Sequence, residues 1–309
     1  MAKIGESGGL KRTESSGLLL ALAGFTILSL GDGVIKTMAG LWPAPAIAAL
    51  RYALGAIGLC SLLLLREGPR PLRQVPRPKI QLLRGLAVSM ATVGFFSAVF
   101  VMPLAEATTI TFSSPMITGL LAVIFLGEPA RRETWIATMI AFAGVLVVLR
   151  PNFAALGWAA FLPLLSAVGM SLLVIGNRAV AGAASALAMQ AYVAGAAAPI
   201  LVLAAIAGHL GGWPGLVLSS PDWSVIARCA LVACTASAAH WLIFLGTTRA
   251  GAASIAPMTY VQLLVATTLG WLWFGEHPDG VTLAGAGVIV GAGIYLWNAG
   301  RRRDAVTRG

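Results

Sequence analysis

Long apolar stretches alternate with short polar breaks along the whole chain. Each stretch is close to the roughly 20 residues that an α-helix needs to cross a hydrocarbon core of about 30 Å. The region 80–126 is about twice that length, so we divide it into two helices. Ten membrane-spanning helices are therefore predicted, at 17–38, 45–65, 80–102, 105–126, 134–149, 156–176, 187–208, 224–246, 250–274 and 281–298.

Lysine and arginine gather at alternate breaks between the predicted helices. If the N-terminus lies in the cytoplasm and ten helices alternate, all but four of the 21 basic residues fall on the cytoplasmic side. The four exceptions are Lys36, Arg51, Arg150 and Arg228. Nine or eleven helices would scatter these charges to both sides, so the positive-inside rule favours ten helices with both termini in the cytoplasm.

Composition agrees with a chain that is embedded in a lipid bilayer. Hydrophobic residues make up 58% of it and charged residues only 10%, whereas soluble domains contain about 25% charged residues. The net charge of +10 lies mostly at helix ends, which indicates cytoplasmic loops rather than nucleic-acid binding. The three cysteines all lie in apolar stretches and form no metal-binding or disulfide pattern.

The two halves of the chain resemble each other. Residues 105–110 (AEATTI) reappear as 250–255 (AGAASI), and 126–128 (LGE) reappear as 274–276 (FGE). Five helices per copy is an odd number, so the copies would insert with opposite topology. We therefore predict two inverted repeats, 1–150 and 151–309, with the substrate site near the membrane midplane between them.

Four motifs together resemble a known family. They are 31–36 (GDGVIK), 103–108 (PLAEAT), 126–128 (LGE) and 256–263 (APMTYVQL). In this order and spacing the chain resembles the EamA branch of the drug/metabolite transporter superfamily along nearly its whole length. The resemblance implies a basket-shaped bundle of two five-helix inverted repeats around a central cavity. It also implies transport of small metabolites across the inner membrane of bacteria.

Charged residues inside the predicted helices are the first site candidates, because each costs about 2.5–3.5 kcal/mol to insert. Asp32 and Lys36 are four residues apart, so they could simply pair with each other. Alternatively, Asp32 binds a proton or a substrate ammonium group, and Lys36 or Arg51 binds a carboxylate. Arg51 could instead extend to the membrane surface. We expect Glu106 to favour a helix N-terminus, and Glu128 and Glu276 to anchor loops.

Hydroxyl side chains on two helices are candidates for the lining of a cavity. Thr108, Thr111 and Ser114 share one face of the fourth helix, and Ser166 and Ser171 lie on the sixth. Small hydroxyl residues also let membrane helices pack closely, so both roles stay open. Two prolines, Pro115 and Pro257, are candidate hinges, because a proline removes a backbone hydrogen bond from its helix.

Aromatic and amide side chains complete the candidate set. His240 and Trp241 lie on the eighth helix, and Tyr260 and Gln262 on the ninth. A histidine titrates near neutral pH, so His240 is a candidate for proton coupling, although a hydrogen-bonded structural histidine is the alternative. A tryptophan such as Trp241 or Trp271 could stack on a flat substrate.

The glycine pattern at 285–291 (GAGVIVG) has the spacing of a nucleotide-binding loop, but that loop works only between a strand and a helix. Here it lies inside an apolar stretch, so we interpret Gly287 and Gly291 as a close-packing face. The chain contains no HExxH, Walker A or Ser-His-Asp pattern. We therefore expect no metal, no cofactor, no enzymatic activity and no ATP-driven pump.

The leading functional hypothesis is a secondary carrier working by alternating access, with a small-molecule substrate and protons as a candidate coupling partner. The family resemblance favours export of amino acids, aromatic ones first. The alternative is uptake of a cofactor-like metabolite such as riboflavin or S-adenosylmethionine, because residues 260–263 (YVQL) resemble members with those substrates. A channel or an intramembrane enzyme is the alternative from a different class.

Overall fold

Helices make up the described fold. The computed structural model describes residues 3–127, 132–250 and 255–307. Helices account for 85% of the structure, and no strand occurs within those three ranges. The predicted all-α class is therefore confirmed, while Glu128 lies outside the described residues.

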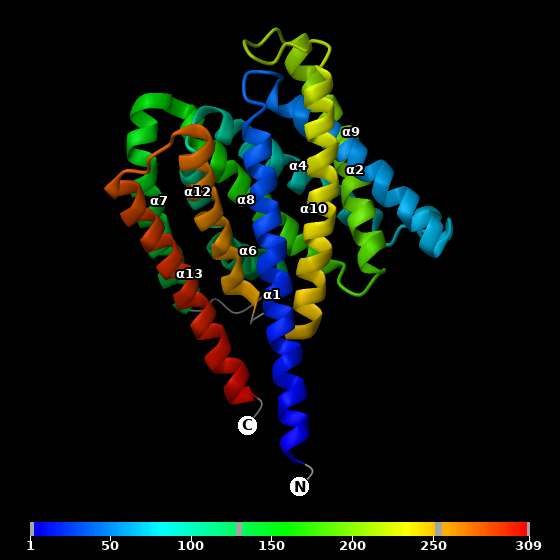
Figure 1. Cartoon of the computed structure of the whole chain (residues 1–309), viewed down its shortest axis with the longest axis vertical. Helices are drawn as coiled ribbons and strands as arrows, with labels where there is room; N and C mark the ends of the chain where they lie inside the picture. Colours follow the sequence, from blue (N-terminus) through cyan, green and yellow to red (C-terminus); the bar gives the residue numbers. More distant parts are fainter. Residues whose placement is uncertain (1–2, 128–131, 251–254, 308–309) are drawn as a thin grey trace.

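The helices follow the predicted apolar stretches closely. Their bounds are α1 Lys3–Lys36, α2 Ala44–Glu67, α3 Arg70–Arg73, α4 Pro78–Val101, α5 Leu104–Thr111, α6 Ser114–Leu126, α7 Arg132–Leu156, η1 Gly157–Phe161, α8 Leu162–Ala179, α9 Ala186–Leu210, α10 Trp223–Ala250, η2 Ala256–Tyr260, α12 Val261–Phe274 and α13 Gly280–Thr307. Figure 1 shows both termini at one end of the bundle, and the connection from α12 to α13 at the other.

Within the described residues, eight helical segments are long and apolar enough to cross a membrane. They are Ser15–Lys36, Ala44–Glu67, Pro78–Val101, Leu104–Leu126, Gly157–Ala179, Ala186–Leu210, Trp223–Ala250 and Gly280–Ala299. The other two predicted spans contain shorter apolar helices, Trp135–Val148 and Met258–Phe274. The chain is thus a multi-pass membrane protein, and the count of ten stays a prediction.

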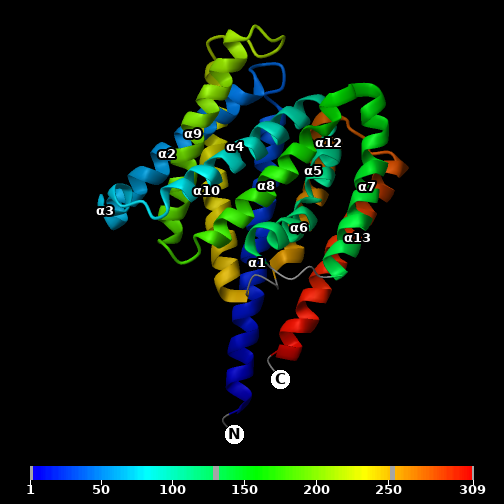
Figure 2. The ribbon, with the colours of Figure 1, turned by 180° about the vertical axis from the view of Figure 1, so that it is seen from behind.

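The closest helix pairs join the first half of the chain to the second. α1 packs against α10, α2 against α9, α4 against α8, α5 against α12 and α7 against α13 (Figures 1 and 2). In the predicted repeat, α1 corresponds to α8 and α4 to α10, so exchanging corresponding helices turns the α1–α10 pair into the α8–α4 pair. The members of each of the other three pairs correspond to each other, so the exchange leaves those pairs unchanged. This pairing supports the predicted inverted repeat, which remains a prediction.

Glycines bring several of these pairs into close contact. A Cβ atom on Gly169 of α8 would lie 2.6 Å from the backbone nitrogen of Ala91 on α4. Gly144 of α7 and Gly285 of α13 face each other, and a Cβ on either would lie 3.0 Å from the other's carbonyl oxygen. The predicted packing face at Gly287 and Gly291 is wrong, because an added Cβ at those two positions would meet nothing within 4 Å.

Both candidate hinge prolines lie at breaks in helices. The fourth predicted helix is divided at Phe112 and Ser113, and Pro115 lies in the first turn of α6. Pro257 lies in the 3-10 turn η2 that precedes α12. Proline suits these positions because it has no N–H to donate in the first turn of a helix.

Candidate functional site

A cavity of about 400 Å³ lies among α1, α2, α4, α5, α8, α9, α10 and α12. Aromatic and aliphatic side chains form much of its wall, as is usual for sites that bind small molecules. Its polar and charged wall residues are Asp32, Arg51, Tyr52, Arg84, Thr92, Thr108, Thr111, Ser166, Asn177, Gln190, Ser237, His240 and Gln262. Both halves of the chain contribute to this wall.

Seven of the residues singled out in the sequence line this cavity. They are Asp32, Arg51, Thr108, Thr111, Ser166, His240 and Gln262. They come from six helices, so the packing of the two halves brings together groups that are far apart in the sequence.

Arg51 is held by aromatic rings inside the cavity and does not extend to the membrane surface. Its guanidinium carbon lies 5.0 Å from the ring centre of Tyr52 and 5.6 Å from that of Phe96. Asp32 and His240 face the same cavity, and the charge of Arg51 acts on both of them. Within the described residues, Asp32 forms neither a hydrogen bond nor an ion pair with another side chain.

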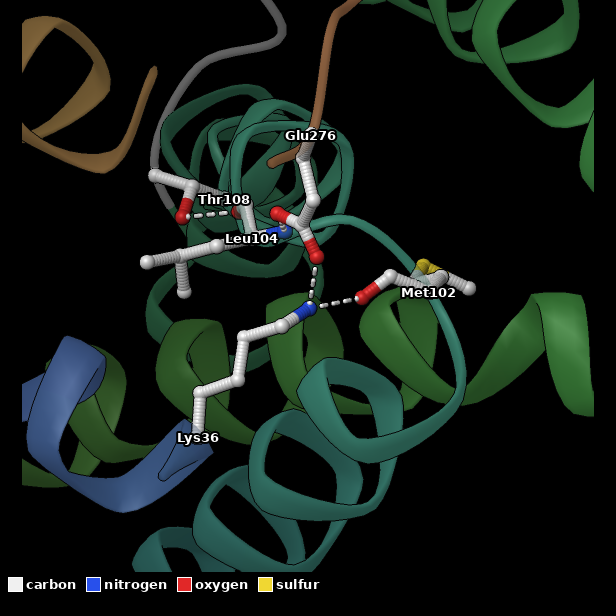
Figure 3. A network of polar contacts seen from close by, with 5 residues as sticks. All are labelled: Lys36, Met102, Leu104, Thr108 and Glu276. Atoms are coloured by element: carbon white, nitrogen blue, oxygen red, sulfur yellow. Dashed lines mark hydrogen bonds and ion pairs between the residues drawn. The ribbon is translucent and has the colours of Figure 1, made fainter. Parts of the chain in front are cut away.

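Lys36 belongs to a different group of contacts, shown in Figure 3. Its Nζ lies 2.5 Å from Oε1 of Glu276 and donates to the carbonyl oxygen of Met102 over 2.6 Å. The backbone N–H of Leu104 donates to the other oxygen of Glu276 over 2.9 Å, and the Thr108 hydroxyl donates to the Leu104 carbonyl over 2.8 Å. We call these five residues the Lys36 network.

The expected pairing of Lys36 with Asp32 is therefore not formed, and Lys36 does not line the cavity. The reason lies in the helix ends around it. α4 ends just before Met102 and α5 begins at Leu104, so a carbonyl and an N–H there lack partners within a helix. Lys36 donates to the free carbonyl of Met102, and Glu276 accepts from the free N–H of Leu104. Glu276 therefore has the anchoring position expected for it.

Thr282 joins two acidic side chains beside this network. Its backbone N–H donates to Asp279 over 2.6 Å, and its hydroxyl donates to Glu106 over 3.4 Å. Asp279 immediately precedes α13, and the hydrogen bonds from the backbone and side chain of Thr282 hold the pKa of Asp279 below its usual range. Glu106 is buried in the first turn of α5, where a carboxylate also favours the helix N-terminus.

Two predicted hydroxyl groups join helices instead of lining the cavity. Ser171 of α8 donates to the carbonyl of Ala167 over 2.7 Å and lies 2.9 Å from the carbonyl oxygen of Ser114 on α6. The two serine Oγ atoms are 3.3 Å apart. The alternative of close helix packing describes this pair, while Thr108, Thr111 and Ser166 reach the cavity.

The predicted aromatic candidates also lie outside the cavity wall. Trp241 is 53% exposed and packs beside Phe244 with ring centres 5.9 Å apart. Trp271 is similarly exposed, so both side chains face outward from the bundle. Tyr260 supports the wall from behind, because its ring meets Phe112 edge to face at 5.6 Å, and Phe112 lines the cavity.

Arg84 is the charged wall residue that the sequence analysis missed, since it was counted among the cytoplasmic charges. It is only 5% exposed and lies on α4 inside an apolar stretch. Its Nε donates to the Asn177 side-chain oxygen over 2.7 Å, and its Nη1 donates to the Gln81 side-chain oxygen. Its position five residues into the predicted span 80–102 is the signal that could have identified it.

Other polar wall residues were missed because they carry no charge. Thr92 donates to the Tyr52 hydroxyl over 3.2 Å, while Asn177 and Gln190 lie in the wall near the turn between α8 and α9. Neutral residues of this kind are common in membrane helices, so the sequence alone gives them no distinction. Within the described ranges, no group of three or more His, Cys, Asp or Glu residues is placed to hold a metal ion.

Comparison with protein families places a match to the EamA-like transporter family over residues 15–150. Three relatives are similar over most of their lengths. An S-adenosylmethionine uptake transporter of Rickettsia bellii is 26% identical over 71% of this chain and 72% of its own. A riboflavin transporter of Rhizobium johnstonii is 26% identical over 93% and 92%. The pseudopaline exporter CntI of Pseudomonas aeruginosa is 28% identical over 91% and 95%.

A protein of known crystal structure shares the fold. It aligns with a TM-score of 0.61 at 20% identity, over 91% of this chain and 97% of its own. At this identity the likeness concerns the arrangement of helices alone.

Proposed function

Because the chain belongs to the EamA-type branch of the drug/metabolite transporter superfamily, we propose that it is a secondary carrier of a small metabolite. The observation that carries this proposal is the cavity of about 400 Å³ between the two halves, with Asp32, Arg51 and His240 in its wall. Charges inside a membrane are costly and commonly mark substrate or proton pathways. A volume of this size lies in the range of roughly 300–1,000 Å³ that holds drug-sized ligands.

The Lys36 network supports a mechanism of alternating access. It ties the end of α1, the α4–α5 connection and the α12–α13 connection together, at the end of the bundle away from the termini (Figure 1). Thr108 belongs to this network and also lines the cavity, so the network adjoins the cavity at that end. We propose that both termini lie in the cytoplasm of a bacterial inner membrane, so that the network forms a gate on the outer side.

The cargo that we favour is a cofactor-like metabolite. Relatives similar over most of their length carry the names S-adenosylmethionine uptake transporter, riboflavin transporter and pseudopaline exporter. Their names include both uptake and export, so direction is left to experiment. Export of amino acids, aromatic ones first, is the second candidate, because aromatic side chains of Tyr52, Phe96 and Phe112 lie in the wall.

Flux measurements with purified protein in liposomes test the proposal. The panel contains S-adenosylmethionine, riboflavin and aromatic amino acids, each with and without a pH gradient. A carrier gives saturable uptake and exchange of labelled cargo against unlabelled cargo from the opposite side. Unsaturable conductive flux would instead indicate a channel, and saturable flux of amino acids alone would favour the second candidate.

A further inference from the structure

Arg84 is a buried cation whose partners are all neutral. It is 95% buried by area, being only 5% exposed, and it lines the cavity. The oxygens that it contacts belong to the side-chain amides of Asn177 and Gln81. Because an arginine has five N–H hydrogens and these bonds use two, three remain without an acceptor among the described residues.

The surrounding residues hold the guanidinium group in a fixed position. Gln81 is itself buried, and its amide nitrogen donates to the carbonyl of Pro76 over 3.2 Å. Gly176 of α8 leaves the room for the stem of Arg84, since a Cβ at Gly176 would lie 2.6 Å from Cγ of Arg84. Amide acceptors orient the fork and leave its charge uncompensated, whereas a carboxylate would neutralise it.

Among the described residues, no acidic group in the wall compensates this charge. Asp32 is the only carboxylate among the described lining residues, and it shares its region of the cavity with Arg51. Arg51 stacks on Phe96, which follows Arg84 by twelve residues on α4, a rise of about 18 Å. Arg51 therefore lies at a different level of the bundle from Arg84, and no described carboxylate of the wall forms an ion pair with Arg84.

We propose that Arg84, with the amide groups of Asn177 and Gln190, binds an anionic oxygen group of the cargo, a carboxylate or a phosphate. This assignment rests on the proposed carrier function and specifies its substrate class as organic anions or zwitterions. A guanidinium group offers paired N–H donors that match both kinds of oxyanion. Asn177 accepts a hydrogen bond from Arg84 through its side-chain oxygen, Gln190 lines the same cavity, and the amide nitrogens of both are neutral donors.

Binding to matched ligand pairs tests this site without requiring transport. The full-length protein is purified in detergent and titrated with S-adenosylmethionine and its decarboxylated form, tryptophan and tryptamine, and flavin mononucleotide and riboflavin. The two members of each pair differ in one carboxylate or phosphate. We expect the anionic member of at least one pair to bind roughly tenfold or more tightly, as charge-assisted hydrogen bonds require.

Variants of Arg84 test whether this residue causes the preference for the anionic ligands. Arg84→Gln is expected to abolish the difference between the two members, and Arg84→Lys to reduce it, because lysine keeps the charge but loses the fork. Arg66→Gln is the control, since Arg66 is exposed at the end of α2 and lies outside the cavity. If Arg84→Gln does not fold, as judged by gel filtration, the Arg84→Lys result decides.

Two results would overturn the assignment. One is the absence of an anionic preference in all three pairs, and the other is a preference that survives unchanged in Arg84→Lys and Arg84→Gln. If the first result is accompanied by competition from added phosphatidylglycerol, the site is assigned to a lipid headgroup instead. Flux assays on the same preparations separate the two proposals. Anion-selective binding without flux supports this binding site and rejects the carrier function. Flux with no preference for the anionic ligands supports the carrier function and rejects this binding site.

Discussion

The Lys36 network and the cavity contain the same kinds of charged residue, arranged in opposite ways. In the network, Lys36 and Glu276 contact each other and also satisfy backbone groups at helix ends. In the cavity, Arg51 rests on aromatic rings and Arg84 on neutral amides, and Asp32 has no side-chain partner within the described residues. Charges that satisfy one another fix a geometry, whereas charges held by neutral groups remain available to a ligand.

The largest expected effect is a loss of stability when the ion pair of the Lys36 network is removed. Glu276→Gln removes the carboxylate that contacts the ammonium of Lys36 and leaves only the more distant Glu106 as a counter-charge. Both side chains of the pair are mostly buried, with exposures of 10% and 18%. Removing one partner of a buried pair costs about 3–5 kcal/mol. Unfolding of the purified protein in detergent measures the loss of stability.

The double variant Lys36→Glu/Glu276→Lys is the control, because it exchanges the charges and should recover part of the stability. If Glu276→Gln lowers the free energy of unfolding by less than about 1 kcal/mol, the size typical of exposed pairs, the Lys36–Glu276 pair does not stabilise the fold as a buried pair would.

The next largest effect is expected in the unpaired region, on transport and not on stability. Asp32→Asn should lower flux by roughly tenfold, equivalent to 1.4 kcal/mol, and leave the unfolding midpoint nearly unchanged. If Asp32 or His240 takes up the coupling proton, Asp32→Asn or His240→Ala should also remove the dependence on a pH gradient. Unchanged flux and pH dependence in both variants would exclude both residues as proton sites.

A smaller effect, on the affinity for cargo, is expected when Arg51 loses its contact with the aromatic rings. Arg51→Lys keeps the positive charge but loses the planar contact with the rings of Tyr52 and Phe96. A cation–π contact contributes about 0.5–1 kcal/mol, so the affinity for cargo should fall by a few fold. Arg51→Gln removes the charge as well, so its affinity for cargo should fall further in the same binding titration. An unchanged affinity in Arg51→Lys would show that the ring contacts contribute nothing.

The smallest effect concerns Asp279, which is exposed beside the network. Its carboxylate accepts hydrogen bonds from Thr282, and its lowered pKa means that it stabilises the fold while it is ionised. This contribution is complete above the ordinary carboxyl pKa of about 4 and is lost as the pH falls through the lowered value. Asp279→Asn should therefore lower the unfolding midpoint slightly at pH 7, and the difference from wild type should narrow toward pH 3. A difference that widens as the pH falls would contradict this assignment.

The sequence was sufficient to predict the helices, because their length and apolarity are local properties. The break before Pro115 and the position of Glu106 in the first turn of a helix also follow from local chemistry. The pairing of Lys36 with Glu276 was not predictable in this way, because it depends on how two connections meet across the bundle. Asp32, only four residues away, was the nearer partner in the sequence.

The candidate site shows the same limit. Asp32, Arg51 and His240 stood out as charges or a histidine within spans, and all three line the cavity. Trp241 was a candidate for stacking on a substrate but faces outward, since the packing of the helices and not the residue type decides which side of a helix faces the cavity. Arg84 was overlooked because a basic residue near a helix end has a ready explanation in membrane topology.

The pairing of helices across the two halves has a consequence for biosynthesis. The partner of α7 is α13, which begins more than a hundred residues later in the chain. At 5–20 residues per second, a ribosome needs on the order of ten seconds to make that interval. During this time the helices of the first half reside in the lipid without their main neighbours, so the membrane-insertion machinery must release or shelter a half-finished bundle whose close-packed glycine face at Gly144 is still open to lipid.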